Sequence, residues 1–374
     1  MSGIVAAGAP SDYGLMGILI TNSAAVKQKL DQLTTQASNG LVGSTYAGLG
    51  SGASVSLNLR PQIANLQAWQ NNADAATGQM AVAQTALTQI QSIAANFYAQ
   101  LNNVQSVNSS EVDTIAASAR DALSQVAGLL DTQDAGVYVF AGQDTGNAPV
   151  PDPDHILTSN FYTQINAAVG SLDPNVNNAA TVAQTTFDAA KFGGTASPFS
   201  TYLTNTQSPS LPTIQVGQNQ TETTGISASA NGLIPVSQSV GQTIPGGPPS
   251  TTGSYMRDVL RALATIGSLS TGQANDPGFQ SLVQDTRISL SNAVNTLGQD
   301  AGVLGNVQSS LTATQARLAD TLTALTGQVS SAEDVDMAAT LSQLSLVQTQ
   351  MQASYQLIAT LNALSLAKFL PVGA

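Results

Sequence analysis

Apolar residues recur at alternating intervals of three and four positions along two long stretches of the chain. The first stretch holds twelve consecutive apolar positions of this kind: Leu66, Trp69, Ala73, Ala76, Met80, Ala83, Leu87, Ile90, Ala94, Phe97, Leu101 and Val104. A repeat of 3.5 residues is typical of a helix that packs along a partner helix. At 1.5 Å per residue, a helix over residues 62–104 would be roughly 65 Å long, which is more than a compact domain of this size needs.

The second stretch repeats the pattern towards the C-terminus. Its apolar positions are Leu290, Val294, Leu297, Ala301, Leu304, Leu311, Leu318, Leu322, Leu325 and Val329. Gln308 and Gln315 occupy the two remaining positions of the repeat. Polar residues inside such a seam can fix the register of two helices at some cost in stability.

Shorter apolar stripes lie at both ends of the chain. They comprise Met16, Ile20, Leu30, Ala37 and Leu41 near the start, and Met337, Leu341, Leu344, Met351, Tyr355 and Ile358 near the end. Lys27 and Thr34 interrupt the first stripe. Neither end can bury such a face alone, so we expect each to contact the other or a neighbouring molecule. The alternative is two ordinary core helices of one globular domain.

The middle of the chain has a different composition, rich in Pro, Gly, Thr, Ser and Asn between Pro149 and Pro249. These residues favour turns and short strands. The pattern predicts a strand over 137–142 and a hairpin over 213–217 and 223–229. The fold class is therefore mainly α, with long coiled-coil helical arms formed by both chain ends and an inserted β-rich domain. The insertion supplies no seam residue, so we expect it to be removable with little effect on the long helices. The predicted division is 1–44 with 334–374, 45–149 with 250–333, and 150–249.

The composition excludes most kinds of active site. Ten Lys and Arg against 22 Asp and Glu give a net charge of −12, which disfavours nucleic acid as a partner. The chain has no Cys and one His, so thiolate and multi-histidine metal sites are excluded. An enzyme that uses Asp152, Asp154 and His155 has little support, because the two prolines in this segment indicate a surface turn. We expect no catalytic residue, cofactor or bound metal.

Two further segments have simple structural explanations. The acids Glu333, Asp334 and Asp336 precede an apolar stripe, where carboxylates favour the start of a helix more than a metal site. The first 20 residues contain no Lys or Arg, so they lack the basic segment of a secretory signal. The apolar run 14–20 is about a third of the length that spans a membrane. We expect a chain that is soluble or exported without a cleaved signal, with no membrane partner.

Several of these motifs resemble one family. Residues 332–338, 341–344 and 351–355 resemble the C-terminal helix of bacterial flagellins and of their relatives at the hook–filament junction. The ending 364–370 is similar to the family's terminal Leu-Ser-Leu pattern, and Leu297-Gly298 is similar to its Leu-Gly motif. Residues 36–40 stand where the family ends its first helix with a Ser-Gly pair. Tyr46–Gly50 replaces the acidic pair that the family usually carries there. The resemblance covers roughly residues 13–148 and 254–370.

The resemblance implies a structural, non-enzymatic subunit that self-assembles into an extracellular tube. In this family both chain ends pair as coiled coils in the core of the tube, and the inserted domain points outward. The implied partners are the chain itself, other flagellar axial proteins (hook-associated proteins and flagellin) and a flagellar export chaperone. Export would proceed unfolded through the flagellum's own channel. The predicted assembly residues are Met16, Ile20, Leu30, Leu341, Leu344, Met351, Tyr355 and Ile358.

Two roles within the family remain open. Residues 136–145 resemble the strand and turn of junction proteins, and residues 348–355 are close to them as well. These segments favour hook-associated protein 3, the hook–filament junction subunit, over the alternative of a major filament flagellin. A hypothesis of another class is a monomeric secreted helical scaffold or adhesin, with the middle domain as its binding surface.

Overall fold

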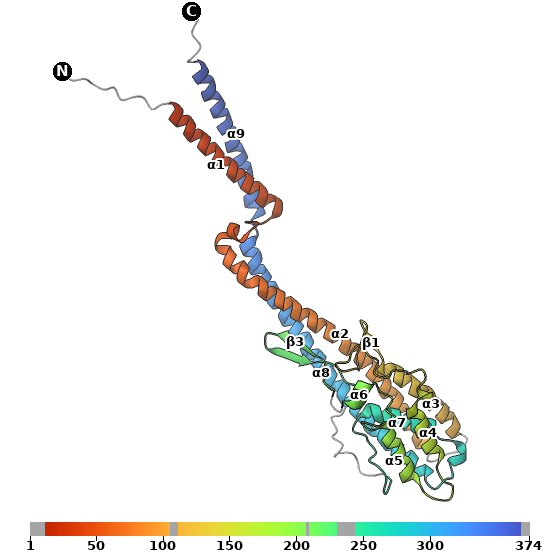
Figure 1. Ribbon diagram of the computed structural model, residues 1–374. Coiled ribbons are helices and arrows are strands. Elements are labelled where there is room, and N and C mark those ends of the chain that lie inside the picture. The colour runs from red at the N-terminus through yellow and green to blue at the C-terminus, as the bar shows by residue number, and fades with distance from the viewer. Residues whose placement is uncertain (1–11, 105–110, 207–208, 230–243, 368–374) are drawn as a thin grey trace, which may run out of the picture. The chain divides into compact units, whose positions relative to one another are not determined.

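The computed structural model describes residues 12–104, 111–206, 209–229 and 244–367. The chain divides into two compact units. Unit 1 comprises residues 1–67 and 320–374, and unit 2 comprises residues 68–319. Two long helices, α2 (Ala53–Val104) and α8 (Phe279–Glu333), contribute residues to both units. Figure 1 labels the helices and strands along the chain.

In unit 2, α2 and α8 run antiparallel along the apolar seam that the sequence predicts (Figure 1). Gln91 Nε2 of α2 donates to the Val294 carbonyl at 3.2 Å, whereas Gln315 Nε2 of α8 donates to Asp74 Oδ1 at 2.8 Å. Residues early in α2 thus contact residues late in α8, as in an antiparallel pair. Eleven of the twelve predicted apolar positions on α2 are buried, and Trp69 is half-buried. The polar seam position Gln315 is satisfied by a specific partner, as expected of a residue that fixes register.

A short helix, α7 (Tyr255–Gly267), forms the centre of unit 2, and all of its residues are buried. It packs against α3 (Val112–Leu130), α4 (Asn160–Gly170) and α5 (Ala179–Ala190). The middle region therefore covers the same core as the long helices. This packing argues against the expectation that the middle can be removed with little effect.

The predicted hairpin forms, with its second strand at Gln220–Thr223 in place of 223–229, but the middle region is more helical than the β-rich domain that the sequence predicts. Besides α4 and α5 it holds η3 (Ile156–Thr158), α6 (Thr201–Asn205) and one hairpin, β3 (Thr213–Gly217) with β4 (Gln220–Thr223). A second hairpin, β1 (Gln133–Asp134) with β2 (Val137–Tyr138), precedes it and is shorter than the predicted strand 137–142. Unit 2 also contains η5 (Thr271–Gln273).

Serine caps explain part of this difference. Ser159 Oγ accepts the backbone N–H of Tyr162 at the start of α4, and Ser200 Oγ accepts that of Leu203 at the start of α6. Small polar residues favour helix N-caps as well as turns. Residues that indicated turns between strands therefore start helices instead.

In unit 1, α1 (Asp12–Asn39) packs along α9 (Met337–Ala367) (Figure 1). Helix α1 ends at the predicted motif: Gly40 adopts a φ of +74°, and its N–H donates to the Gln36 carbonyl at 2.9 Å. This left-handed glycine is a common helix C-terminus. Asp336 Oδ1 accepts the N–H groups of Ala338 and Ala339 at the start of α9, which confirms the predicted helix-starting role for that acid.

Candidate assembly site

The two terminal segments are joined by backbone pairing where α1 ends and α9 begins. The Val42 N–H donates to the Glu333 carbonyl at 2.7 Å, and the Val335 N–H donates to the Gly40 carbonyl at 2.9 Å. Together they form an antiparallel bridge centred on Leu41 and Asp334. Helices α1 and α9 therefore leave this bridge side by side and run antiparallel.

A regular stripe of less exposed residues follows each of these helices. The stripe on α1 is Leu19, Ser23, Val26, Leu30, Leu33 and Ala37, and that on α9 is Thr340, Leu344, Val347, Met351, Ser354 and Ile358. Both stripes alternate steps of three and four residues, as the seam of a two-helix coiled coil does. We call these residues the α1–α9 seam.

The predicted stripes share every second position with this seam and differ at the others. On α1 the prediction takes Ile20, Lys27 and Thr34 where the seam has Leu19, Val26 and Leu33. Steps of three and four can be taken in either order, and the order taken in the structure leaves Lys27 and Thr34 in solvent. Lys27 and Thr34, the polar residues that interrupt the predicted stripe, indicated that α1 uses the other order of steps.

The predicted assembly residues fall into three groups. Leu30, Leu344, Met351 and Ile358 lie in the α1–α9 seam and are half-buried. Ile20, Leu341 and Tyr355 lie outside it and are exposed. Met16 belongs to α1, but its side chain lies outside the described residues. Their role in contacts between subunits stays a prediction.

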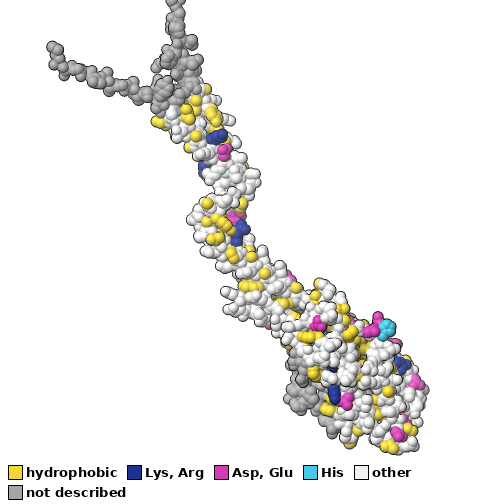
Figure 2. Space-filling view, viewed as in Figure 1, with side chains coloured by type: hydrophobic (Ala, Val, Ile, Leu, Met, Phe, Trp, Pro, Cys, Tyr) yellow, Lys and Arg dark blue, Asp and Glu magenta, His cyan; other side chains and the backbone are white. Residues whose placement is uncertain are grey.

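Exposed apolar side chains are concentrated in unit 1. Among the described residues twelve large hydrophobic side chains are exposed, and ten of them belong to this unit, which is about a third of the chain. The ten are Ile18, Ile20, Tyr46, Val55, Leu57, Met337, Leu341, Leu346, Tyr355 and Leu357. Figure 2 shows such side chains on the surface of the terminal helices on the face in view. Apolar residues on more than one side are typical of a buried helix, and α9 carries them although those outside the α1–α9 seam are exposed.

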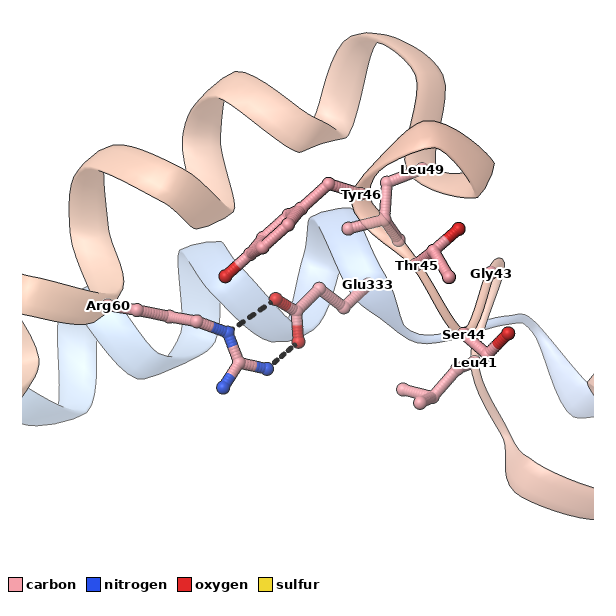
Figure 3. Close-up of a pocket in the computed structure, with 8 residues that line it drawn as sticks. All are labelled: Leu41, Gly43, Ser44, Thr45, Tyr46, Leu49, Arg60 and Glu333. Atoms are coloured by element: carbon pink, nitrogen blue, oxygen red, sulfur yellow. Dashed lines mark hydrogen bonds and ion pairs between the residues drawn. The ribbon is translucent and has the colours of Figure 1, made fainter.

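A charged cluster lies beside the terminal bridge. Arg60 of α2 donates to Glu333, the last residue of α8, through Nε at 2.8 Å and Nη2 at 2.5 Å, and the Ser56 hydroxyl also donates to Glu333. These bonds from Arg60, and then from Ser56, lower the pKa of the Glu333 carboxyl. Figure 3 shows the pair facing each other between the two helices, with the Tyr46 ring extending towards it from η1 (Tyr46–Gly52). The cluster ties the beginning of α2 to the end of α8 within unit 1.

Sequence reasoning missed this cluster. It assigned Glu333 to the start of the final helix and gave no role to Arg60 or Ser56. One signal was present: Arg60 is the only Lys or Arg in the 52 residues of α2. A lone cation in a long helix whose only other charged residue is Asp74 indicates a specific partner.

Catalytic chemistry finds no support among the described residues. His155 Nδ1 lies 2.9 Å from Asp152 Oδ1, and both side chains are exposed. The hydrogen bond to Asp152 raises the pKa of His155, as in an ordinary surface pair. In the part of the chain that the structure describes, no three His, Cys, Asp or Glu residues gather in a group that could hold a metal ion. None of the helices in that part combines the length and apolar character that a membrane span requires.

Comparison with known proteins supports the interpretation of the terminal helices. The family model for the bacterial flagellin N-terminal helical region matches residues 15–145. The family model for the bacterial flagellin C-terminal helical region matches residues 289–370. No curated protein matches the chain. The two matched regions together span more than half of the chain and contain α2, α9 and most of α1 and α8, so the chain belongs to the bacterial flagellin family.

Proposed function

We propose that this protein is the subunit at the hook–filament junction of the bacterial flagellum. As a member of the flagellin family it is a structural, non-enzymatic flagellar component. The finer assignment rests on residues 136–145, which resemble the strand and turn of junction proteins, and on residues 348–355 of α9.

The strand and turn form a defined feature at the edge of unit 2. Ala135 and Gly136 both adopt positive φ values between β1 and β2, as a tight hairpin turn requires. The Tyr138 N–H then donates to the Thr145 carbonyl at 3.1 Å, and Phe140 is fully buried. Phe140 thus anchors residues 136–145, the segment that resembles junction proteins, to the core of unit 2.

The alternative is the main filament subunit, which the two family matches fit equally well. A monomeric scaffold or adhesin has less support, because the exposed apolar faces of α9 favour a helix that other subunits cover. The family self-assembles, which supports the chain itself and other axial proteins as partners. We further propose that the chain is exported through the flagellar channel with a dedicated chaperone and is located in the extracellular flagellum.

Deleting the gene in its host, followed by electron microscopy, tests the assignment. A junction subunit predicts bare hooks, with the filament protein still made and released into the medium. A filament subunit predicts bare hooks and loss of the filament protein itself. An epitope in the middle region gives a second reading by immunogold labelling: one point of label between hook and filament for a junction subunit, and label along the whole filament for a filament subunit.

A further inference from the structure

An asparagine followed by a glycine lies at the bridge between the terminal segments. Asn39 is the last residue of α1 and is exposed, and Gly40 follows it with a positive φ. A second such pair, Asn231-Gly232, lies outside the described residues. In an Asn-Gly pair the backbone nitrogen of the glycine can attack the side-chain amide of the asparagine, because no Cβ shields that nitrogen. Asn39 is therefore a candidate for chemical modification that needs no enzyme.

The hydrogen bond that Asn39 accepts favours this attack. The Leu41 N–H donates to Asn39 Oδ1 at 2.9 Å, so the side-chain amide is held against the backbone that follows it. Negative charge develops on Oδ1 during the attack, and a backbone N–H that already faces this oxygen stabilises that charge. Apart from its chain neighbours, no atom lies within 4 Å of the position that a Cβ on Gly40 would occupy. The nucleophile is thus accessible, and the oxygen that takes the charge is already solvated by the protein.

One hydrogen bond has to open before the reaction. The Gly40 N–H donates to the Gln36 carbonyl at 2.9 Å and closes the last turn of α1. Helix ends fray at a small cost in free energy, so this turn opens while the rest of the helix stays formed. The bond slows the attack without preventing it.

We propose that Asn39 converts to aspartate and isoaspartate in the folded protein, and that this conversion weakens the bridge between the terminal segments. The Gly40 nitrogen bonds to Asn39 Cγ, and Nδ2 leaves as ammonia with the proton of the Gly40 N–H, which gives a cyclic imide. Water then opens the ring and returns a proton to the Gly40 nitrogen. Its hydroxyl adds to Cγ to give aspartate, or to the backbone carbonyl carbon to give isoaspartate.

Both products disturb the bridge. Isoaspartate adds one methylene to the backbone directly before Gly40, whose carbonyl accepts the Val335 N–H at 2.9 Å. Val42, which donates to the Glu333 carbonyl at 2.7 Å, follows two residues later, so the added methylene shifts the register of both bonds. Aspartate instead adds a carboxylate at the negative end of α1, next to the pairing of Leu41 with Asp334.

Peptide mass spectrometry of the purified full-length protein tests the reactivity. The protein is incubated at pH 8 in native buffer and, in parallel, in concentrated urea, and isoaspartate is detected with an isoaspartyl methyltransferase. Asn58 is the matched control, because it is exposed on α2 and is followed by Leu59. We expect Asn39 to convert in native buffer at least tenfold faster than Asn58 and at most tenfold slower than in urea. Equal rates at the two asparagines, or a larger slowing by the native fold, would overturn the inference.

Hydrogen exchange of the Val42 and Val335 amides tests the effect on the bridge. Exchange in incubated protein with most of Asn39 converted should be at least fivefold faster than in fresh protein. Asn39→Ser has no side-chain amide to lose, so its incubated and fresh samples should exchange alike, which also controls for conversion of Asn231. Unchanged exchange in the converted native chain would overturn the link to the bridge. Both measurements use the purified chain, so neither depends on the proposed function.

Discussion

Arg257 offers the sharpest test of how the middle region is held to unit 2. Its side chain is 2% exposed on α7, and its nitrogens donate to the carbonyls of Ser229 at 3.0 Å, Ala190 at 3.1 Å and Leu203 at 3.2 Å. Ala190 ends α5, and Leu203 lies in α6. The guanidinium also stacks 4.8 Å from the centre of the Phe199 ring. One side chain thus joins three segments of the middle region to α7.

The expected change in unfolding free energy combines two losses and one gain. Arg257→Met keeps most of the packing but leaves three buried carbonyls without this donor, at about 1–3 kcal/mol each. It also removes a cation–π contact worth about 1–2 kcal/mol. Against this, burial lowers the pKa of Arg257 to about 10, so removing the charge regains about 3 kcal/mol of desolvation. Together these terms give a net loss of about 1–8 kcal/mol of unfolding free energy.

Arg257→Lys separates hydrogen-bond geometry from charge. An ammonium group keeps the charge but cannot reach carbonyls on three segments, so this variant should be at least as unstable as Arg257→Met. Urea unfolding of the purified monomer, followed by circular dichroism, measures both, and Arg317→Met at an exposed position should change stability by less than about 0.5 kcal/mol. An Arg257→Lys variant as stable as the native chain would refute the reasoning.

Two further predictions concern the same unit. Burial raises the pKa of Asp131 to about 6, so this carboxyl binds a proton more strongly in the folded protein than in the unfolded chain. The free energy of unfolding should therefore fall as the pH rises through 6 and the buried carboxylate becomes charged. Asp131→Asn should therefore exceed the native chain in stability by more at pH 7.5 than at pH 5, and an equal difference at both pH values in urea unfolding would contradict this. Replacing residues 150–249 with a short Gly/Ser linker should uncover Arg257 and Asp258 on α7 and lower the melting temperature of the remainder by more than about 10 °C. Unchanged melting by circular dichroism would instead restore the view that the middle is a separate insertion.

The long helices could be predicted because their apolar repeat is nearly continuous. Over α2 the repeat has one buried side, so a single register explains every position from Leu66 to Val104. The terminal helices carry apolar residues on more than one side, and the repeat alone does not decide which order of steps faces the partner. Ile20 was assigned to the stripe for this reason, although it is exposed.

Contacts between residues that lie far apart in the sequence could not be predicted, for a different reason. Arg60 and Glu333 are separated by 273 positions, and Arg257 binds carbonyls 28 to 67 positions away. A carbonyl acceptor has no side-chain signature, so nothing in the sequence marks Ala190 or Leu203 as partners of an arginine. Polar caps were ambiguous as well, since Ser159 and Ser200 favour turns and helix starts alike.

The central claim is that the terminal helices α1 and α9 mediate assembly of this subunit into the flagellum. The most direct test is whether a variant with a changed residue in the α1–α9 seam is still incorporated into flagella. Met351→Asp places a carboxylate in the α1–α9 seam, where a buried unpaired charge costs several kcal/mol. Gln356→Asp, exposed and about 140° away around α9, is the matched control. Immunoblots of purified flagella and of the medium should show Met351→Asp in the medium alone and Gln356→Asp in flagella, while unit 2 of both monomers melts as in the native chain. Native levels of Met351→Asp in flagella would contradict the account.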